Sequence, residues 1–129
     1  MGGRKFSNKV VVVTGAASGI GLAVARRFAR SGATCALLDM DEARLKRCER
    51  QFSQAGHRAM GLPCDVTQRA DCETAVQAVI DRFGGIDVLF NNAGITQRSA
   101  FTETRIEVYE RVMAVNFFGA LYCTKAAIH

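Results

Sequence analysis

The stretch at residues 10–21, VVVVTGAASGIG, decides how this chain of 129 residues is organised. Four consecutive valines are typical of a strand that is buried on both faces, as in a parallel sheet covered by helices. The residues that follow carry Gly15, Gly19 and Gly21 and lead into a stretch of helical period. Such a turn lets a ligand approach the backbone, and the unpaired amides at the start of the helix favour a pyrophosphate. The stretch therefore predicts a dinucleotide-binding turn; the alternative is a tight turn with a structural role alone.

Short apolar runs alternate with longer helical patterns along the rest of the chain. The runs at 34–38, 58–63 and 86–90 join 10–13 as candidate strands. Alternation of this kind favours a parallel sheet with helices on its faces. We therefore expect an α/β fold, a Rossmann-type doubly wound parallel sheet with strand order 3-2-1-4, truncated after the fourth strand and following helix. No repeat or linker divides the sequence, so 1–129 is predicted to be one domain.

Apolar stripes between these runs predict the helices and the faces that they bury. Ile20, Val24 and Phe28 form the first stripe, at i, i+4 and i+8. The second stripe is Leu45, Cys48, Phe52 and Ala55, and the third is Cys72, Ala75, Val76, Val79, Ile80 and Phe83, before a Gly84-Gly85 stop. A fourth helix is expected to begin near Thr104, which has the spacing of a capping box with Glu107.

Charge, hydropathy and cysteine content narrow the class of protein. The net charge is +5, but basic residues alternate with acids, as at 41–50, which indicates a solvated helix face and no nucleic-acid partner. No apolar run is long enough for a membrane span, so we expect a cytoplasmic protein without membrane contact. Five cysteines without Cys-x-x-Cys spacing indicate buried thiols. Because His57 and His129 lack ligand spacing to a cysteine, no metal site is predicted.

An acidic residue, Asp39, follows the second run, eighteen positions beyond Gly21. A carboxylate at the end of this strand can accept hydrogen bonds from the hydroxyls of an adenosine ribose and would repel a 2′-phosphate. NAD is therefore favoured over NADP as the cofactor. The alternative is that Asp39 is a helix N-cap or a surface carboxylate.

Four motifs, in this order, resemble the signatures of the classical short-chain dehydrogenases/reductases. They are Thr14, Gly15, Gly19 and Gly21 in Thr-Gly-x-x-x-Gly-x-Gly spacing, Asp65-Val66 after the third run, Asn91-Asn92-Ala93-Gly94 after the fourth, and Asn116 within VNFFG at 115–119. The resemblance extends from about Lys9 to the end of the chain. It implies that Gly15, Ser18, Gly19, Ile20 and Gly21 belong to the pyrophosphate loop.

The resemblance also implies roles for the residues after the third and fourth runs. Asp65 would bind the adenine amino group, with Val66 packed beside the ring. An Asx turn that caps a helix starting near Thr67 is a compatible alternative for Asp65. Three further residues would pass close to the ribose and nicotinamide of the cofactor: Asn92, Ala93 and Gly94. The asparagine amides would also tie the fourth strand to its neighbours.

Asn116 stands in an otherwise apolar helical segment, where an unpaired amide would be costly if buried. In the family, the corresponding asparagine holds a water of the proton relay, so the resemblance implies a catalytic role for Asn116. A helix kink or an amide paired within the core is the alternative.

The sequence departs from the family in its tyrosines. The family's general acid/base is a tyrosine with a lysine four residues later, but here the residue four positions after Tyr109 is Met113, and that after Tyr122 is Ala126.

By resemblance, the complete protein transfers hydride between NAD(H) and a small carbonyl or secondary alcohol. This chain would supply the cofactor-binding part of an enzyme that is a homo-oligomer when complete. The chain is expected to be a fragment that is inactive alone; a non-catalytic dinucleotide-binding or interaction module is the alternative. Thr96, Gln97 and Arg98 are expected to border the substrate pocket, but they identify no substrate.

Overall fold

The computed structural model describes residues 4–95 and 99–128. The expectation for residues 96–98 therefore lies outside the described residues. The strands are β1 (Val10–Thr14), β2 (Thr34–Asp39), β3 (Ala59–Pro63) and β4 (Val88–Phe90). The main helices are α1 (Gly19–Arg30), α2 (Glu42–Gln54), α3 (Arg69–Phe83), α4 (Ile106–Met113) and α5 (Gly119–Ala127). After β4 comes a short 3-10 turn, η1 (Phe101–Glu103), and a π-helical turn, η2 (Ala114–Phe118), joins α4 to α5.

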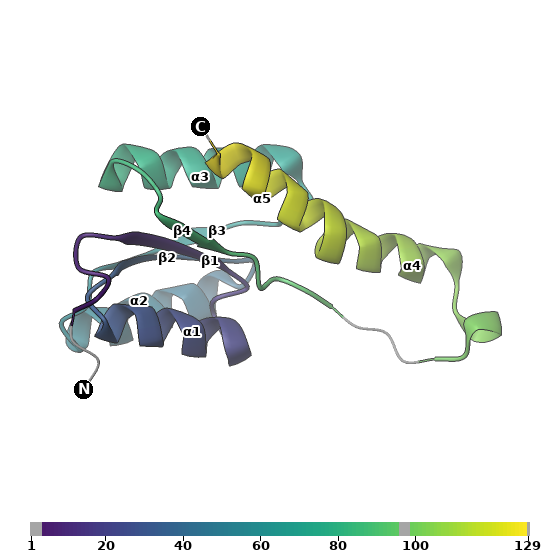
Figure 1. Ribbon diagram of the computed structural model, residues 1–129. Helices are drawn as coiled ribbons and strands as arrows, with labels where there is room; N and C mark the ends of the chain where they lie inside the picture. The colour runs from purple at the N-terminus through teal and green to yellow at the C-terminus, as the bar shows by residue number, and fades with distance from the viewer. Residues whose placement is uncertain (1–3, 96–98, 129) are drawn as a thin grey trace.

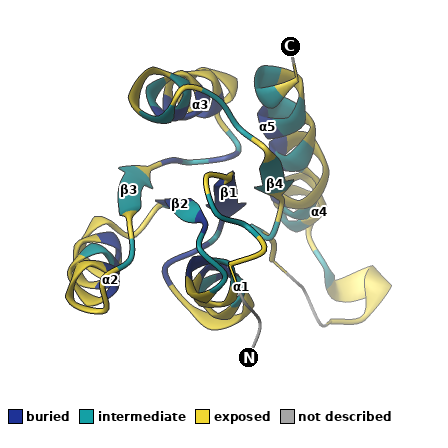
Figure 2. Cartoon of the chain, turned by 60° about the vertical axis from the view of Figure 1, so that its left-hand side comes forward, coloured by how far each residue is buried: buried dark blue, intermediate teal, exposed yellow. Residues whose placement is uncertain are grey.

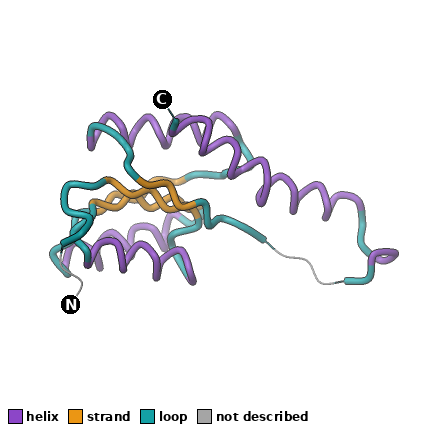
Figure 3. The backbone as a smooth tube through the Cα atoms, viewed as in Figure 1, coloured by secondary structure: helices purple, strands orange, loops and turns teal. Residues whose placement is uncertain are grey.

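The strands form one parallel sheet in the order β3-β2-β1-β4, as predicted. Helices α1 and α2 cover one face of the sheet, and α3 and α5 cover the other (Figures 1 and 2). The path from α4 through η2 to α5 is one long helix, of which α5 lies over one face of the sheet and α4 extends beyond the end of the sheet (Figure 3). Because the strands are parallel, the carboxyl ends of β1, β2 and β4 lie at the same edge of the sheet, where ligands bind in folds of this kind.

Strand β1 is buried along its whole length because both of its faces are covered. Val11 and Val13 lie in the core beneath α1 and α2, together with residues such as Phe52. Val10 and Val12 point to the opposite core, which α3 and α5 complete. The two cores explain the unbroken valine run, since alternate side chains of the strand enter opposite layers.

The apolar stripe predicted for α1, Ile20, Val24 and Phe28, is confirmed only in part. The residues that α1 buries are Gly21, Ala25 and Ala29, whereas Ile20 is 72% exposed. Val24 and Phe28 are partly buried at the margin of the core. Small side chains let the helix lie close to the sheet, so the contact face follows residue size rather than hydrophobicity. The buried residues of α2 and α3 follow the predicted stripes, except that Ala55 is exposed beyond the end of α2.

The starts of β4 and α4 also differ from the prediction. Strand β4 begins at Val88 rather than residue 86, because the Asp87 carboxylate accepts the hydrogen bond from Val10 N at 2.8 Å in place of a strand carbonyl. The capping box is wrong: α4 begins at Ile106, and the Thr104 hydroxyl donates to Ala100 O at 2.9 Å instead of capping the helix. Throughout residues 4–95 and 99–128, every helix is too short or too polar to cross a membrane.

Candidate functional site

The turn after β1 leaves the start of α1 open. Ala16 N donates to Leu38 O at 3.1 Å and Ala17 N to an Asp39 oxygen at 3.0 Å, so the first half of the turn is tied to β2. The first hydrogen bond of the helix runs from Leu22 N to Ser18 O at 3.2 Å. The amides at 18–21 precede it and have no helical acceptor, and the Ser18 side chain does not cap them. These amides form a potential anion site at the positive end of the helix.

Two glycines of this turn are required by close packing and by backbone conformation. A Cβ atom on Gly21 would lie 2.2 Å from Gly15 O and 2.6 Å from Asn92 Nδ2. Gly19 has φ of +56°, and the space that its Cβ would occupy contains no atom within 4 Å. Gly21 therefore holds the helix against the turn, while Gly19 leaves the backbone uncovered.

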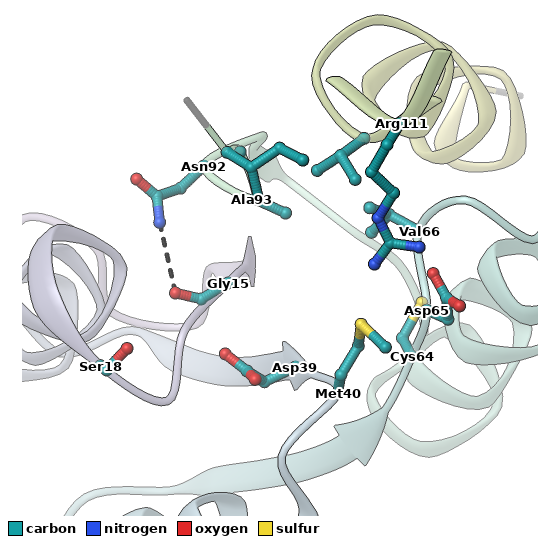
Figure 4. A pocket seen from close by; sticks show the side chains of 13 residues that line it. Gly15, Ser18, Asp39, Met40, Cys64, Asp65, Val66, Asn92, Ala93 and Arg111 are labelled. Carbon is teal, nitrogen blue, oxygen red and sulfur yellow. Dashed lines mark hydrogen bonds between the residues drawn. The ribbon is translucent and has the colours of Figure 1, made fainter. Parts of the chain in front are cut away.

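Thr14 and Asn92 connect the ends of β1 and β4. The Thr14 hydroxyl accepts hydrogen bonds from Asn92 N at 3.0 Å and Ala93 N at 2.9 Å. Asn92 Nδ2 donates to Gly15 O at 3.2 Å, the bond drawn in Figure 4. The expected tie between the fourth strand and its neighbour is thus present for Asn92. The part played by the buried Thr14 hydroxyl was not predicted.

Asp39 stands at the end of β2 with both carboxylate oxygens engaged. One oxygen accepts from Ala17 N and the other from Asp41 N, each at 3.0 Å. The N-cap of α2 is Asp41, which accepts from Arg44 N at 3.0 Å, so the alternative of Asp39 as the N-cap is wrong. Asp39 thus holds the glycine turn from below and presents a negative charge to the space beside it (Figure 4).

Asp65 forms an Asx turn after β3. Its Oδ1 accepts from Thr67 N at 3.0 Å and from the Thr67 hydroxyl at 2.7 Å. The helix that follows, α3, starts at Arg69, two residues later than predicted. Val66 is buried against Gly119, where an added Cβ would lie 2.7 Å from Val66 Cγ2.

Asn116 lies in the π-helical turn η2, and its side chain is directed to the backbone after β4. Its Oδ1 accepts from Ile95 N at 2.8 Å, and its Nδ2 donates to Ile95 O at 2.7 Å. The residue is exposed, so the alternative of an amide paired within the core is wrong, whereas the interruption of the regular helix agrees with the kink alternative. Turns of the π type within α-helices are frequently found at functional sites.

A cavity of about 300 Å³ lies at the carboxyl ends of the strands (Figure 4). Eight of the predicted cofactor-binding residues line it: Gly15, Ser18, Asp39, Asp65, Val66, Asn92, Ala93 and Gly94. Gly19, Ile20 and Gly21 are not in its lining, and neither is Asn116, which acts on the cavity through Ile95. The volume falls within the range of small-molecule sites.

The lining also includes residues that the sequence analysis did not select: Met40, Cys64, Ile95, Arg111 and Val115. Met40, Cys64 and Ile95 are direct neighbours of predicted residues, so a search along each strand end would have found them. Arg111 and Val115 are four residues apart and share a helix face. Their role depends on how the long helix lies relative to the sheet, which the sequence pattern does not specify.

All five cysteines are buried free thiols, as predicted. Burial raises the pKa of Cys64, which lines the cavity, and of its neighbour Cys72. A thiol with a raised pKa is a poor nucleophile and a poor metal ligand at neutral pH. Within the part of the chain that the structure describes, no group of His, Cys, Asp and Glu residues could hold a metal ion.

The parallel sheet, the open glycine turn at the end of its central strand and the carboxylate on the neighbouring strand define a Rossmann-type domain. Residues 9–129 match the family model described as short chain dehydrogenase, and the chain belongs to that family.

Relatives of this family are similar over most of the chain. Galactitol 2-dehydrogenase of Agrobacterium fabrum is 39% identical over 122 residues, which are 95% of this chain and 46% of that protein. Meso-2,3-butanediol dehydrogenase of Serratia marcescens is 36% identical over 124 residues, 96% of this chain and 49% of that protein. The chain thus spans about half the length of the curated relatives it matches.

Solved structures of the family have the same fold. A xylitol dehydrogenase with NAD⁺ bound has a TM-score of 0.91 and 39% identity, over 95% of this chain and 48% of that one. A short-chain type dehydrogenase/reductase from Mycobacterium marinum has a TM-score of 0.91 and 30% identity, over 95% of this chain and 49% of that one. The curated relatives and these structures are dehydrogenases or reductases, so the family is one of oxidoreductases.

Proposed function

We propose that this chain binds NAD(H) across the carboxyl ends of β1, β2 and β4. The observation that carries the proposal is the open start of α1, where the amides at 18–21 precede the first helical hydrogen bond and Gly19 leaves them uncovered. Backbone amides at a helix start favour linked phosphates because they combine several donors with the positive end of the helix dipole. The pyrophosphate would therefore lie against Gly15, Ser18, Gly19, Ile20 and Gly21.

The other parts of the cofactor are assigned to the remaining residues that line the cavity. Asp39 would accept hydrogen bonds from the ribose hydroxyls, and Asp65 with Val66 would hold the adenine. Asn92, Ala93 and Gly94 lie beside the glycine turn and would border the ribose and nicotinamide. Preference for NAD over NADP is supported by the negative charge of Asp39 and by the NAD⁺ bound in the similar xylitol dehydrogenase.

The complete protein is proposed to oxidise a secondary alcohol or reduce a carbonyl compound. Bound NAD(H) would supply or accept the hydride. The chain's own contribution is to bind and orient the dinucleotide, and Asn116 is proposed to position the polar groups after β4 and a water of the proton relay. Neither Tyr109 nor Tyr122 lines the cavity or has a lysine four residues on. We therefore expect the 129-residue chain to bind cofactor without sustaining turnover.

A pair of glycine variants tests the binding proposal. Gly19 and Gly84 both have positive φ, and an added Cβ on either would meet no atom within 4 Å. Gly19→Ala and Gly84→Ala should therefore lose similar stability, about 1 kcal/mol each. We expect Gly19→Ala to weaken NADH binding at least about tenfold, because the methyl group enters the space above the helix start. Gly84→Ala, remote from the cavity, should bind NADH like the unchanged chain.

Fluorescence titration with NADH measures both variants, and urea unfolding measures their stability. A chain that binds no NADH at millimolar concentration, or a Gly19→Ala variant that binds as well as Gly84→Ala, would refute the proposed site. Steady NADH-dependent turnover by chain of verified mass would refute the expectation that it is inactive alone.

A further inference from the structure

The cavity has two chemically different ends. Gly15, Ser18 and Asn92 surround one end, where backbone amides and the asparagine side chain are polar and close together (Figure 4). Met40 and Arg111 belong to the other end, beside the side chains that follow β3 (Figure 4). This second end combines the Met40 thioether, the Cys64 thiol, the Val66 side chain, the Asp65 carboxylate and the Arg111 guanidinium. Such a surface suits a flat ring with a hydrogen-bond donor on its edge better than it suits a phosphate.

Arg111 reaches this end from α4. Its guanidinium points into the cavity from above, and the side chain of Met40 points into it from the end of β2 on the other side (Figure 4). Met40 is 59% exposed, so its thioether is available to a ligand in the cavity. The ion pairs among the described residues are Arg44–Asp41, Arg69–Glu73 and Arg105–Glu107, and Arg111 takes part in none of them. The guanidinium is therefore directed at the cavity without an anionic partner in the described chain.

Asp65 borders the end of the cavity that contains Met40 and Arg111. Its Oδ1 is taken by the two bonds to Thr67, which fix the carboxylate in place. An ionised carboxylate only accepts hydrogen bonds, so its second oxygen suits an amino group on the edge of a ring. Among the cavity-lining residues that the structure describes, Arg111 is the one cation, and Asp39 and Asp65 are the carboxylates.

We propose that Arg111 and Met40 are the two faces of a slot for the adenine base of the cofactor, with Asp65 at the edge of the slot. Arg111 is then a specificity-determining residue that recognises the adenosine half of the cofactor. This inference rests on the proposed function and deepens it. A guanidinium plane stacks on an aromatic face and adds a cation–π attraction, which a lysine or an aliphatic side chain does not reproduce in full. Sulfur on the opposite face also packs favourably against an aromatic ring.

The competing role for Arg111 is a charge contact with the phosphates. Its place at the end opposite Gly15 and Ser18 argues against that role (Figure 4). The two roles differ in a measurable way, because ADP-ribose carries the adenine and nicotinamide mononucleotide carries a phosphate without it. A phosphate contact would favour both ligands, and it would survive the change of Arg111 to lysine.

The test compares Arg111→Leu, Arg111→Lys and the control Arg105→Leu in the 129-residue chain. Arg111 is exposed, so its replacement should leave the fold intact, which thermal unfolding verifies. Arg105 precedes the same helix and pairs with Glu107 at 3.4 Å on the surface, outside the cavity lining. Calorimetry would measure the affinity for ADP-ribose, and displacement of NADH would measure that for reduced nicotinamide mononucleotide.

We expect Arg111→Leu to weaken ADP-ribose binding about fivefold to thirtyfold, as for loss of a desolvated cation–π contact, with Arg111→Lys in between. Binding of the mononucleotide should stay within about twofold, and Arg105→Leu should change neither affinity. Equal losses for both ligands, or full affinity for ADP-ribose in Arg111→Leu, would overturn the inference and leave the proposed function standing. An unchanged chain that binds neither NADH nor ADP-ribose would overturn both.

Discussion

The side-chain amide of Asn116 pairs with both backbone polar groups of Ile95, as a neighbouring strand would. Oδ1 accepts from Ile95 N at 2.8 Å, and Nδ2 donates to Ile95 O at 2.7 Å. The π-helical turn that contains Asn116 is thereby joined to the segment that leaves β4. Because Ile95, Gly94 and Ala93 all line the cavity, this one amide holds a wall of the candidate site in place.

Replacing Asn116 with alanine should therefore weaken cofactor binding through that wall. Two exposed hydrogen bonds are worth about 1–2 kcal/mol together, which corresponds to about fivefold or more in affinity if the order of the segment is lost. Asn91→Ala is the matched control, since Asn91 Nδ2 makes one exposed bond, to the Thr124 hydroxyl at 3.1 Å, and Asn91 is absent from the cavity lining. Fluorescence titration with NADH compares them. Equal affinities in the two variants would show that the pairing does not support the site.

A second prediction concerns the packing of the glycine turn. A Cβ on Gly21 would lie 2.2 Å from Gly15 O, and the hydrogen bond from Asn92 Nδ2 holds that oxygen in place. Gly21→Ala should cost about 2–3 kcal/mol of stability, as overpacking does in a close contact. Gly85→Ala, where the added Cβ meets nothing within 4 Å, should stay within about 0.5 kcal/mol. Urea unfolding measures the stability of both variants. A Gly21→Ala chain as stable as Gly85→Ala would contradict the requirement for glycine at position 21.

The fold could be predicted from the sequence because its signals are local. The unbroken valines of β1, the stripes of α2 and α3 and the glycine turn each specify an element, and alternation of such elements leaves few topologies. The site residues at strand ends were found for the same reason, since parallel strands bring their carboxyl ends to one edge. Asp39 and Asp65 line one cavity although they are far apart in sequence.

Features that depend on distances between elements could not be predicted. The buried face of α1 is set by how closely the helix approaches the sheet, which favours Ala25 over Ile20. The place of Arg111 depends on how the long helix lies relative to the sheet, and an exposed arginine carries no sequence signal of a ligand. The bonds from Asn116 to Ile95 need the chain to return after 21 residues, and no sequence pattern indicates that pairing.

The choice between NADH and NADPH should depend on the charge of Asp39. Its carboxylate is fixed by Ala17 N and Asp41 N, so it cannot turn away from a 2′-phosphate. We expect the chain to bind NADH about tenfold or more tightly than NADPH, and Asp39→Asn to bring the ratio of the two affinities toward one. Asp41→Asn is the control, because that carboxylate caps α2 and does not line the cavity. Preference for NADPH by the unchanged chain, or an unchanged ratio in Asp39→Asn, would defeat the argument.

The buried thiols predict how stability changes at alkaline pH. Burial raises the pKa of Cys35 and of Cys123 from the ordinary value of 9.0 to about 12. Above pH 9 the unfolded chain therefore loses thiol protons that the folded chain retains. The stabilisation that comes from the protonated buried thiols is therefore fully present below about pH 9 and is lost as the pH rises toward 12. Each fully buried thiol contributes a loss of about 1.4 kcal/mol by pH 10.

Cys35→Ala isolates one such contribution. Between pH 7.5 and pH 10, urea unfolding should show that this variant loses about 1.4 kcal/mol less stability than the unchanged chain, because its unfolded state has one thiol fewer to ionise. Val79→Ala is the control: Val79 is as fully buried as Cys35 but does not titrate, so its loss should equal that of the unchanged chain. The three chains differ at position 35 or 79 alone, so contributions from the rest of the chain cancel in the comparison. Equal losses in Cys35→Ala and Val79→Ala would mean that the folded Cys35 thiol ionises near its ordinary pKa, and its burial would then have no effect on its charge.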